Sequence, residues 1–266
     1  MKKLLLLFVA LTLVLTSCSS EENSSLENSS EEYSVFPKTI SYIYPNTTLG
    51  TNSTSTLKFD GNKIVSISKY DSKTKFIYNG DFIIKQEVFD LDLQGNETKD
   101  KEVLYNYENG KLKTRLFKEN ITVNYPDGQY IEKVLYTHSS NLISYINYRV
   151  DKDTKVEVKS SEGTLTYNGG NLVKEMQVVG SLTRTRTYEY DTKYNPLKNI
   201  LGFDLLLNEI NEFGKNNVLK TTSISSDFPT QANYVTTYIY NDNDYPSKKT
   251  SLTGGGLVEY EIEYTY

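Results

Sequence analysis

The sequence predicts an all-β fold, an antiparallel meander of repeated hairpins that forms a curved sheet or a closed barrel, with one short helix inserted near residues 204–213. Three observations predict it: a recurring aromatic pair, turn-forming residues directly after each pair, and alternating polar and apolar residues between turns. The chain holds 23 tyrosines, against no tryptophan and one histidine. Aromatic residues two positions apart lie on one face of a strand, because side chains alternate along it.

A short unit organises the chain. Two large side chains two positions apart precede Asn, Asp or Glu, often Gly, and then an aliphatic residue. Asn-Gly and Asp-Gly supply the positive φ angles that a tight hairpin turn requires. The clear copies span Leu57–Ile64, Phe76–Gly80, Tyr105–Leu112 and Leu165–Leu172, with looser copies at Val123–Gly128, Tyr188–Asp191 and Tyr238–Asn241. A unit of about 20 residues with insertions predicts seven to eight hairpins and a dozen or more strands.

The last strand is the clearest example of alternation. One face carries Tyr260, Ile262, Tyr264 and Tyr266, and the other carries Glu259, Glu261 and Glu263. This pattern predicts one buried face and one wet face. It also resembles the assembly signal of outer-membrane barrels, but such a barrel needs an apolar outward face on every strand. Because residues 183–190 and 149–159 offer no apolar face, we expect a β domain that does not face lipid.

One segment departs from strand alternation. Leu206, Leu207, Ile210 and Phe213 recur at helical spacing after Asp204, and Gly214 follows as a helix cap. We expect a short helix that plugs an open end or edge of the sheet. The alternative is a lid over a site.

The first residues predict export and lipidation. Lys2-Lys3 precede a twelve-residue apolar stretch, too short to span a membrane as a helix. Leu15-Thr16-Ser17-Cys18 resembles the lipobox of bacterial lipoproteins, which implies that residues 1–17 are a signal peptide and that the thiol of Cys18 carries the lipid. Two or three acyl chains, such as palmitate, hold a protein on a membrane permanently.

A polar, acidic stretch follows the cysteine. Residues 18–36 are expected to form the lipidated cysteine and a flexible tether, because a segment rich in Ser, Glu and Asn buries too little apolar surface to fold. Residues 37–266 then form a single β-meander domain. Acid directly behind the cysteine resembles the surface-export signal of Bacteroidota lipoproteins. We therefore expect an outer-membrane protein facing outward, with the periplasmic face as the alternative.

Composition excludes some classes of partner. Removing residues 1–17 takes away two of the 29 basic residues and none of the 34 acidic ones, so the formal charge changes from −5 to −7. An acidic chain without a basic run argues against nucleic acid. With Cys18 as its one cysteine, the mature chain forms no intramolecular disulfide and depends on its core for stability.

The repeated unit carries a resemblance. Aromatic-x-Tyr followed by an acidic residue or Asn, then Gly and Leu, is similar to the YD, or RHS, repeat of bacterial surface and toxin proteins. Asn195-Pro196-Leu197-Lys198-Asn199 is similar to uncharacterised Bacteroidota lipoproteins with a porin-like β fold. The units here lack the Gly-Arg of most RHS repeats, and the domain is too small to enclose a partner protein as RHS shells do.

Catalytic motifs are missing from the sequence. The sole histidine, His138, sits at an expected strand end, and there is no nucleophile elbow, phosphate loop or zinc motif. We expect no enzyme and no cofactor. Carboxylate-pair chemistry on glycans remains an alternative, because two acids need only be near in space.

Two weaker patterns suggest ligands. Asp90, Asp92 and Glu97 fall in a stretch with part of the spacing of a calcium loop, and Asp242-Asn243-Asp244 is a shorter echo. The same residues also form hairpin turns without a metal. Arg184 and Arg186 share a strand face with Tyr188 and Tyr190, where the four could hold an anionic or sugar ligand. The alternative is that the arginines pair with neighbouring glutamates.

These observations predict a lipid-anchored binding or interaction module of the cell envelope. Its expected partners are the membrane, through the Cys18 lipid, and a glycan or a protein. A structural envelope protein without a small ligand is the second hypothesis, and a glycan-active enzyme is the third.

Overall fold

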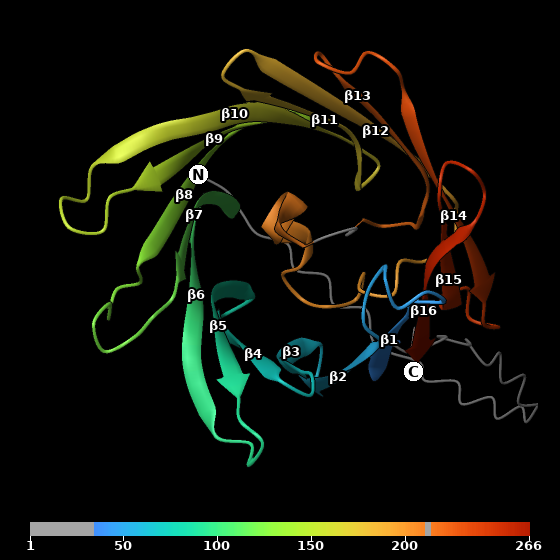
Figure 1. The fold of residues 1–266 in the computed structure, drawn as a ribbon, viewed down its shortest axis with the longest axis horizontal. Coiled ribbons are helices and arrows are strands. Elements are labelled where there is room, and N and C mark those ends of the chain that lie inside the picture. The colour runs from blue at the N-terminus through green and yellow to red at the C-terminus, as the bar shows by residue number, and fades with distance from the viewer. Residues whose placement is uncertain (1–34, 211–213) are drawn as a thin grey trace, which may run out of the picture. The chain divides into compact units, whose positions relative to one another are not determined.

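The computed structural model describes residues 35–210 and 214–266, which form a closed antiparallel barrel. Each strand pairs with its neighbours along the chain, and β1 closes the ring against β16, with Tyr42 opposite Ile262. The expectation of an all-β meander is confirmed, in its closed form (Figure 1). The expected signal peptide, Cys18 and the tether up to residue 34 lie outside the described residues.

The described residues contain sixteen strands and one 3₁₀ helix. Their bounds are β1 Thr39–Ile43, β2 Ser53–Asp60, β3 Lys63–Ser68, β4 Ser72–Asn79, β5 Phe82–Leu91, β6 Glu97–Glu108, β7 Lys111–Glu119, β8 Tyr130–Ser139, β9 Leu142–Val150, β10 Glu157–Asn168, β11 Asn171–Val179, β12 Leu182–Tyr190, η1 Asp204–Glu209, β13 Val218–Ser225, β14 Ala232–Tyr240, β15 Pro246–Leu252 and β16 Val258–Thr265.

Tight turns join the strands at one rim of the barrel. Gly61 and Gly80 have positive φ angles of 57° and 60°, and Asn109 and Gly110 both have positive φ in the turn between β6 and β7. These are the turns that the repeated unit predicts. One looser copy was assigned wrongly: Val123–Gly128 belongs to a loop, because Pro126 cannot donate to a strand ladder and Thr122 and Tyr125 bond each other's backbone instead.

The second aromatic of a unit marks a β-bulge. The strand register shifts directly before Phe59, Tyr78, Tyr107, Tyr167, Tyr190 and Tyr240. A bulge adds one residue to one strand and frees backbone groups of the ladder. Each repeat therefore encodes a hairpin with a bend in it, which the sequence pattern alone did not reveal.

The outer face of the barrel is charged. Glu102 alternates with Val103, a core residue, so its carboxylate points outward. There it contacts the ammonium groups of Lys85, Lys99 and Lys118 at 3.0, 2.5 and 3.3 Å. Further outward pairs link neighbouring strands, namely Lys73–Glu97, Lys133–Glu157, Lys220–Glu189 and Lys248–Glu261.

The inner face holds the core. Aliphatic and tyrosine side chains of β2 to β11 pack against three residues of the long β12–β13 connection, Ile200, Phe203 and Leu206. Figure 1 shows η1 in the middle of the ring of strands. The segment thus plugs the barrel interior, in line with the first of the two expected roles.

The helix is shorter than its sequence pattern suggests. It spans Asp204–Glu209 as a 3₁₀ helix, Leu207 has a positive φ of 57°, and Ile210 is already extended. Contacts with the barrel wall override the helical periodicity here. Among the described residues, no helix has the length and hydropathy needed to span a bilayer.

Val35 and Phe36, assigned to the tether by the sequence, contact the barrel. The ring of Phe36 lies 4.9 Å from that of Phe59, and the amide of Asn199 donates to the carbonyl of Val35 at 3.0 Å. The described chain is therefore in contact with the barrel from its first residues.

Candidate functional site

The plug is fixed to one half of the barrel wall. The carboxylate of Glu209, on η1, forms an ion pair with Arg115 on β7 at 2.5 Å and accepts a hydrogen bond from the hydroxyl of Tyr136 on β8, also at 2.5 Å. Burial raises the pKa of Glu209, and the charge of Arg115 counteracts that effect. Phe203 adds a ring contact with Phe76 on β4.

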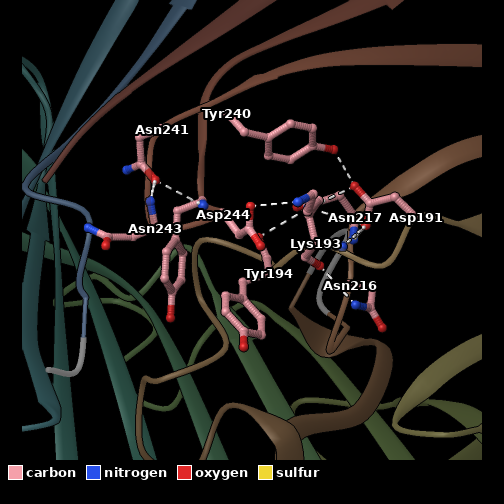
Figure 2. Close-up of polar contacts among 10 residues, drawn as sticks. Asp191, Lys193, Tyr194, Asn216, Asn217, Tyr240, Asn241, Asn243 and Asp244 are labelled. Atoms are coloured by element: carbon pink, nitrogen blue, oxygen red, sulfur yellow. Dashed lines mark hydrogen bonds and ion pairs between the residues drawn. The ribbon is translucent and has the colours of Figure 1, made fainter. Parts of the chain in front are cut away.

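The two ends of the plug are held at the rim of tight turns. Asp191 accepts hydrogen bonds from the backbone and side-chain amides of Asn217 and from the hydroxyl of Tyr240. Figure 2 shows Tyr240 and Asn217 both pointing toward Asp191. The plug therefore leaves β12 and rejoins the wall at β13 beside Asp191, where these hydrogen bonds hold both of its ends.

A cavity of about 800 Å³ lies between the plug and the other half of the wall. Strands β10 to β16 line it on one side, and Leu207, Asn208 and Ile210 line it on the other. Among the lining residues of the strand wall, Arg184 and Tyr234 are the exposed ones. Both lie beside the loops at 180–181 and 226–231, so the cavity opens toward the rim opposite the tight turns.

The four residues singled out by sequence as a ligand group all line this cavity. Arg184, Arg186, Tyr188 and Tyr190 point inward from β12, while the alternating threonines and Glu189 point outward. The structure brings them together because β12 has one unbroken register with β11 from Lys174 to Val179. The sequence thus located one wall of the cavity.

Glu175 holds part of this wall in place. Its carboxylate accepts hydrogen bonds from Arg186 at 3.3 Å and from the hydroxyl of Tyr188 at 3.2 Å. A third hydrogen bond comes from Tyr145. Burial, together with the charge of Glu175, raises the pKa of Tyr188 to about 12, so the phenol stays protonated and donates to the carboxylate at neutral pH.

Arg184 differs from Arg186 in its contacts. Within residues 35–210 and 214–266, no carboxylate lies within ion-pair distance of Arg184, although Asp227 lies near enough to be influenced by its charge. Arg186 has its charge balanced by Glu175. The pairing alternative for the two arginines therefore describes Arg186 and not Arg184.

The comparisons with known proteins concern this barrel as a whole. A porin-like protein from Bacteroides vulgatus ATCC 8482 superposes with a TM-score of 0.62 at 14% identity, over 88% of this chain and 99% of that one. A porin-like protein from Bacteroides uniformis ATCC 8492 gives 0.54 at 10% identity, over 86% and 97%. The chain shares the porin-like barrel fold.

At these identities the likeness concerns the fold alone. No family model matches the sequence, and the comparison with curated proteins found no match. The porin-like expectation is thereby confirmed at the level of architecture.

The residues of the suggested calcium loop are used for other contacts. Asp92 accepts hydrogen bonds from the backbone of Gln94 and Asn96 and closes its own turn. Glu97 instead pairs with Lys73 and Lys75, and Asp90 is exposed. In the described parts of the chain, no group of three or more His, Cys, Asp or Glu side chains is arranged to hold a metal ion.

The shorter echo is also a turn. Asn241 accepts from the backbone of Asn243 and Tyr245, and Asp244 receives the ammonium of Lys193 at 2.6 Å (Figure 2). In both stretches Asp and Asn therefore shape a turn, which is the alternative to calcium binding that the sequence left open.

Sequence reasoning assigned one cavity residue to the wrong face. Strict alternation assigns Glu259 to the wet face of β16, but the register shifts between Ser251 and Leu252, and Glu259 lines the cavity and accepts from the Ser251 hydroxyl at 3.1 Å. The Gly254-Gly255-Gly256 run before β16 was a signal for such an irregularity, since glycines favour bulges and bends.

Proposed function

We propose that this protein is a lipid-anchored envelope protein whose barrel binds a small polar ligand in the cavity beside the plug. The observation that carries the proposal is the inward grouping of Arg184, Arg186, Tyr188 and Tyr190 around a cavity of about 800 Å³. Small-molecule sites are concave and have volumes of roughly 300–1,000 Å³. A fixed plug on one side and a strand wall on the other provide a preorganised site.

The anchor and the barrel have separate roles in this proposal. Cys18 carries the lipid after residues 1–17 are removed, the tether spaces the barrel from the bilayer, and the protein faces outward from the outer membrane. The Lys–Glu pairs on the outer face support a barrel outside the hydrocarbon layer, because a transmembrane barrel needs an apolar band there. The porin-like architecture then serves binding and not permeation. The proposal also includes that the hairpin units of this barrel are related to the YD, or RHS, repeat.

A cell fractionation experiment tests the anchor. The wild-type protein is expected in the membrane pellet, resistant to high salt, whereas Cys18→Ser is expected in the soluble fraction. Ser17→Ala, which keeps a small residue before the cysteine, is the matched control and should pellet. A salt-resistant pellet for Cys18→Ser would refute the anchor.

A thermal-shift screen with the full-length protein in detergent tests the cavity. The probes are sugars, amino acids, dicarboxylates and nucleotides, each at millimolar concentration. At least one class should raise the melting temperature of the wild type, by mass action. That shift should disappear in Ser223→Trp, which fills the cavity, and shrink in Arg184→Ala. A shift that survives both changes, or no shift from any class, would overturn a ligand role and favour a purely structural envelope protein.

Catalysis on glycans is the second candidate, and the lining of the cavity is the observation that favours it. Glu175 and Glu259 are two carboxylates on the same cavity, and glycoside hydrolysis uses a pair of acids that flank the scissile bond. Against it, Glu175 already accepts hydrogen bonds from Arg186, Tyr188 and Tyr145. Release of reducing ends from an oligosaccharide mixture, lost in Glu259→Gln, would establish the enzyme.

A further inference from the structure

The cavity lining combines ring faces with hydroxyl groups. Five tyrosines line it, and so do four aliphatic hydroxyl residues. These are Tyr167, Tyr188, Tyr190, Tyr234 and Tyr260, with Thr221, Ser223, Thr236 and Ser251. The hydroxyl of Tyr190 is occupied by the carbonyl of Leu172 at 2.7 Å, so the part of this residue left for a ligand is its ring.

The charges in the lining cancel. Two carboxylates, Glu175 and Glu259, and two guanidinium groups, Arg184 and Arg186, line the same cavity. Glu175 and Arg186 neutralise each other. What remains for a ligand is a guanidinium at Arg184 and a carboxylate at Glu259, the latter held by the Ser251 hydroxyl.

This balance discriminates between ligand classes. An anion near Arg184 shares the cavity with two carboxylates, and a cation shares it with two arginines, so net charge gains little at this site. An apolar ligand would bury the guanidinium and the carboxylate without partners, at a cost of several kcal/mol. A neutral ligand with many hydroxyl groups can accept from Arg184, donate to Glu259 and lay its C–H faces on tyrosine rings.

We infer that the cavity binds a neutral oligosaccharide of a few sugar rings, an inference that rests on the proposed ligand role of the same cavity. Tyr234 supplies the main stacking surface, because the residue is 48% exposed and lies at the open rim. Arg184 donates to hydroxyl or ring oxygens, and Glu259 accepts from hydroxyl groups. The plug residues Leu207 and Asn208 close the opposite side.

The test uses the full-length protein in detergent on an array of neutral, acidic and amino oligosaccharides, followed by calorimetry with the best neutral glycan. Tyr234→Ala and Arg184→Ala should each weaken binding roughly tenfold, the loss expected for one stacking or charge-assisted contact. Tyr234→Phe, which keeps the ring, should bind within about twofold of the wild type. These residues are exposed enough for the variants to fold, and melting temperatures check that they do.

Matched controls lie away from the cavity. Tyr70, which is 84% exposed, and the exposed Arg149 are not part of the lining, so Tyr70→Ala and Arg149→Ala should bind as the wild type does. Binding to acidic or amino glycans alone, or neutral-glycan binding unchanged in both Tyr234→Ala and Arg184→Ala, would overturn the inference. If no glycan binds while another probe class shifts the melting temperature in a Ser223-dependent way, the ligand class is wrong and the ligand role of the cavity stands.

Discussion

The hydroxyl of Tyr107 on β6 donates to the backbone carbonyl of Ile83 on β5 at 2.8 Å. Ile83 lies opposite Tyr78 at a β-bulge, so its carbonyl has been released from the strand ladder. The relationship recurs around the barrel. Tyr190 donates to Leu172, Tyr238 to Val218 and Tyr266 to Pro246, and His138 contacts the carbonyl of Leu112. A side chain of one hairpin thus contacts a backbone carbonyl that a β-bulge has freed in the hairpin before it.

This arrangement predicts that removing a single hydroxyl oxygen lowers the stability of the fold. Tyr107→Phe keeps the ring but leaves the Ile83 carbonyl without its donor, and an unsatisfied buried acceptor costs about 1–3 kcal/mol. We expect the free energy of unfolding, measured with urea, to fall by that amount. Tyr70→Phe, at a residue that is 84% exposed, is the control and should stay within experimental error. Equal stability of the two variants would contradict a stabilising role of the Tyr107 hydroxyl.

The buried ion pair that fixes the plug predicts a larger effect. The side chains of Arg115 and Glu209 are 18% and 13% exposed. Glu209→Gln leaves the guanidinium uncompensated, which costs about 3–5 kcal/mol. The double variant Arg115→Met, Glu209→Leu should recover most of the loss, because it removes both charges.

The exposed pair Lys113–Glu108 serves as the reference for that experiment. Its side chains are 40% and 61% exposed, so Lys113→Met should cost less than about 1 kcal/mol. A double variant at 115 and 209 that is no more stable than Glu209→Gln would show that the plug is not held by this pair.

Glu102 predicts how stability changes in acid. Burial alone would raise its pKa, but hydrogen bonds from Lys99 and Lys85 outweigh burial and lower the pKa to about 2. Because the pKa is lower in the folded than in the unfolded state, Glu102 stabilises the fold above its ordinary pKa of about 4.5 and loses that contribution as the pH falls toward 2. The amount is on the order of 2–3 kcal/mol.

Urea unfolding at several pH values between 7 and 2 measures this contribution. Glu102→Gln should be less stable at pH 7 and should lose less stability on acidification than the wild type. Glu108→Gln, at an exposed carboxylate, should follow the wild-type curve. Parallel curves for the wild type and Glu102→Gln would contradict the assignment.

Gly163 predicts an intolerance to even one methyl group. A Cβ there would lie 2.2 Å from the carbonyl oxygen of Met176 and 2.5 Å from the hydroxyl of Tyr145. Gly163→Ala should therefore destabilise the fold by about 1–3 kcal/mol or more, the usual cost of overpacking. Gly255→Ala, whose Cβ would meet its nearest atom at 3.9 Å, should have the melting temperature of the wild type.

Local patterns were enough to predict much of the fold. Alternation and turn chemistry are local properties, so the hairpins around Gly61, Gly80 and Gly110 were predictable from neighbouring residues. The same alternation placed Arg184, Arg186, Tyr188 and Tyr190 on one face of β12. It did not tell which strands would lie across from them, because opposite walls of a barrel are far apart in sequence.

The errors have physical causes of the same kind. Glu259 was assigned to the wet face because a bulge changes which face a residue occupies without changing the residue types around it. Helical spacing also did not reveal that η1 is a 3₁₀ helix in which Leu207 has a positive φ angle. Spacing also did not reveal that Asp92 closes its own turn while Glu97 pairs with Lys73.

The sequence by itself determined the strands, their turns and the tyrosine repeat of this protein, because each depends on the conformational preferences of a few adjacent residues. Only the tertiary structure decided that the ring closes between β1 and β16 and that Glu209 ties the plug to one half of the wall. It also decided that a polar cavity lies between the plug and strands β10 to β16. These features join residues far apart in the sequence, 94 positions for Arg115 and Glu209 and 220 positions for Tyr42 and Ile262. Such contacts are chosen by the packing of the whole barrel and not by any local pattern.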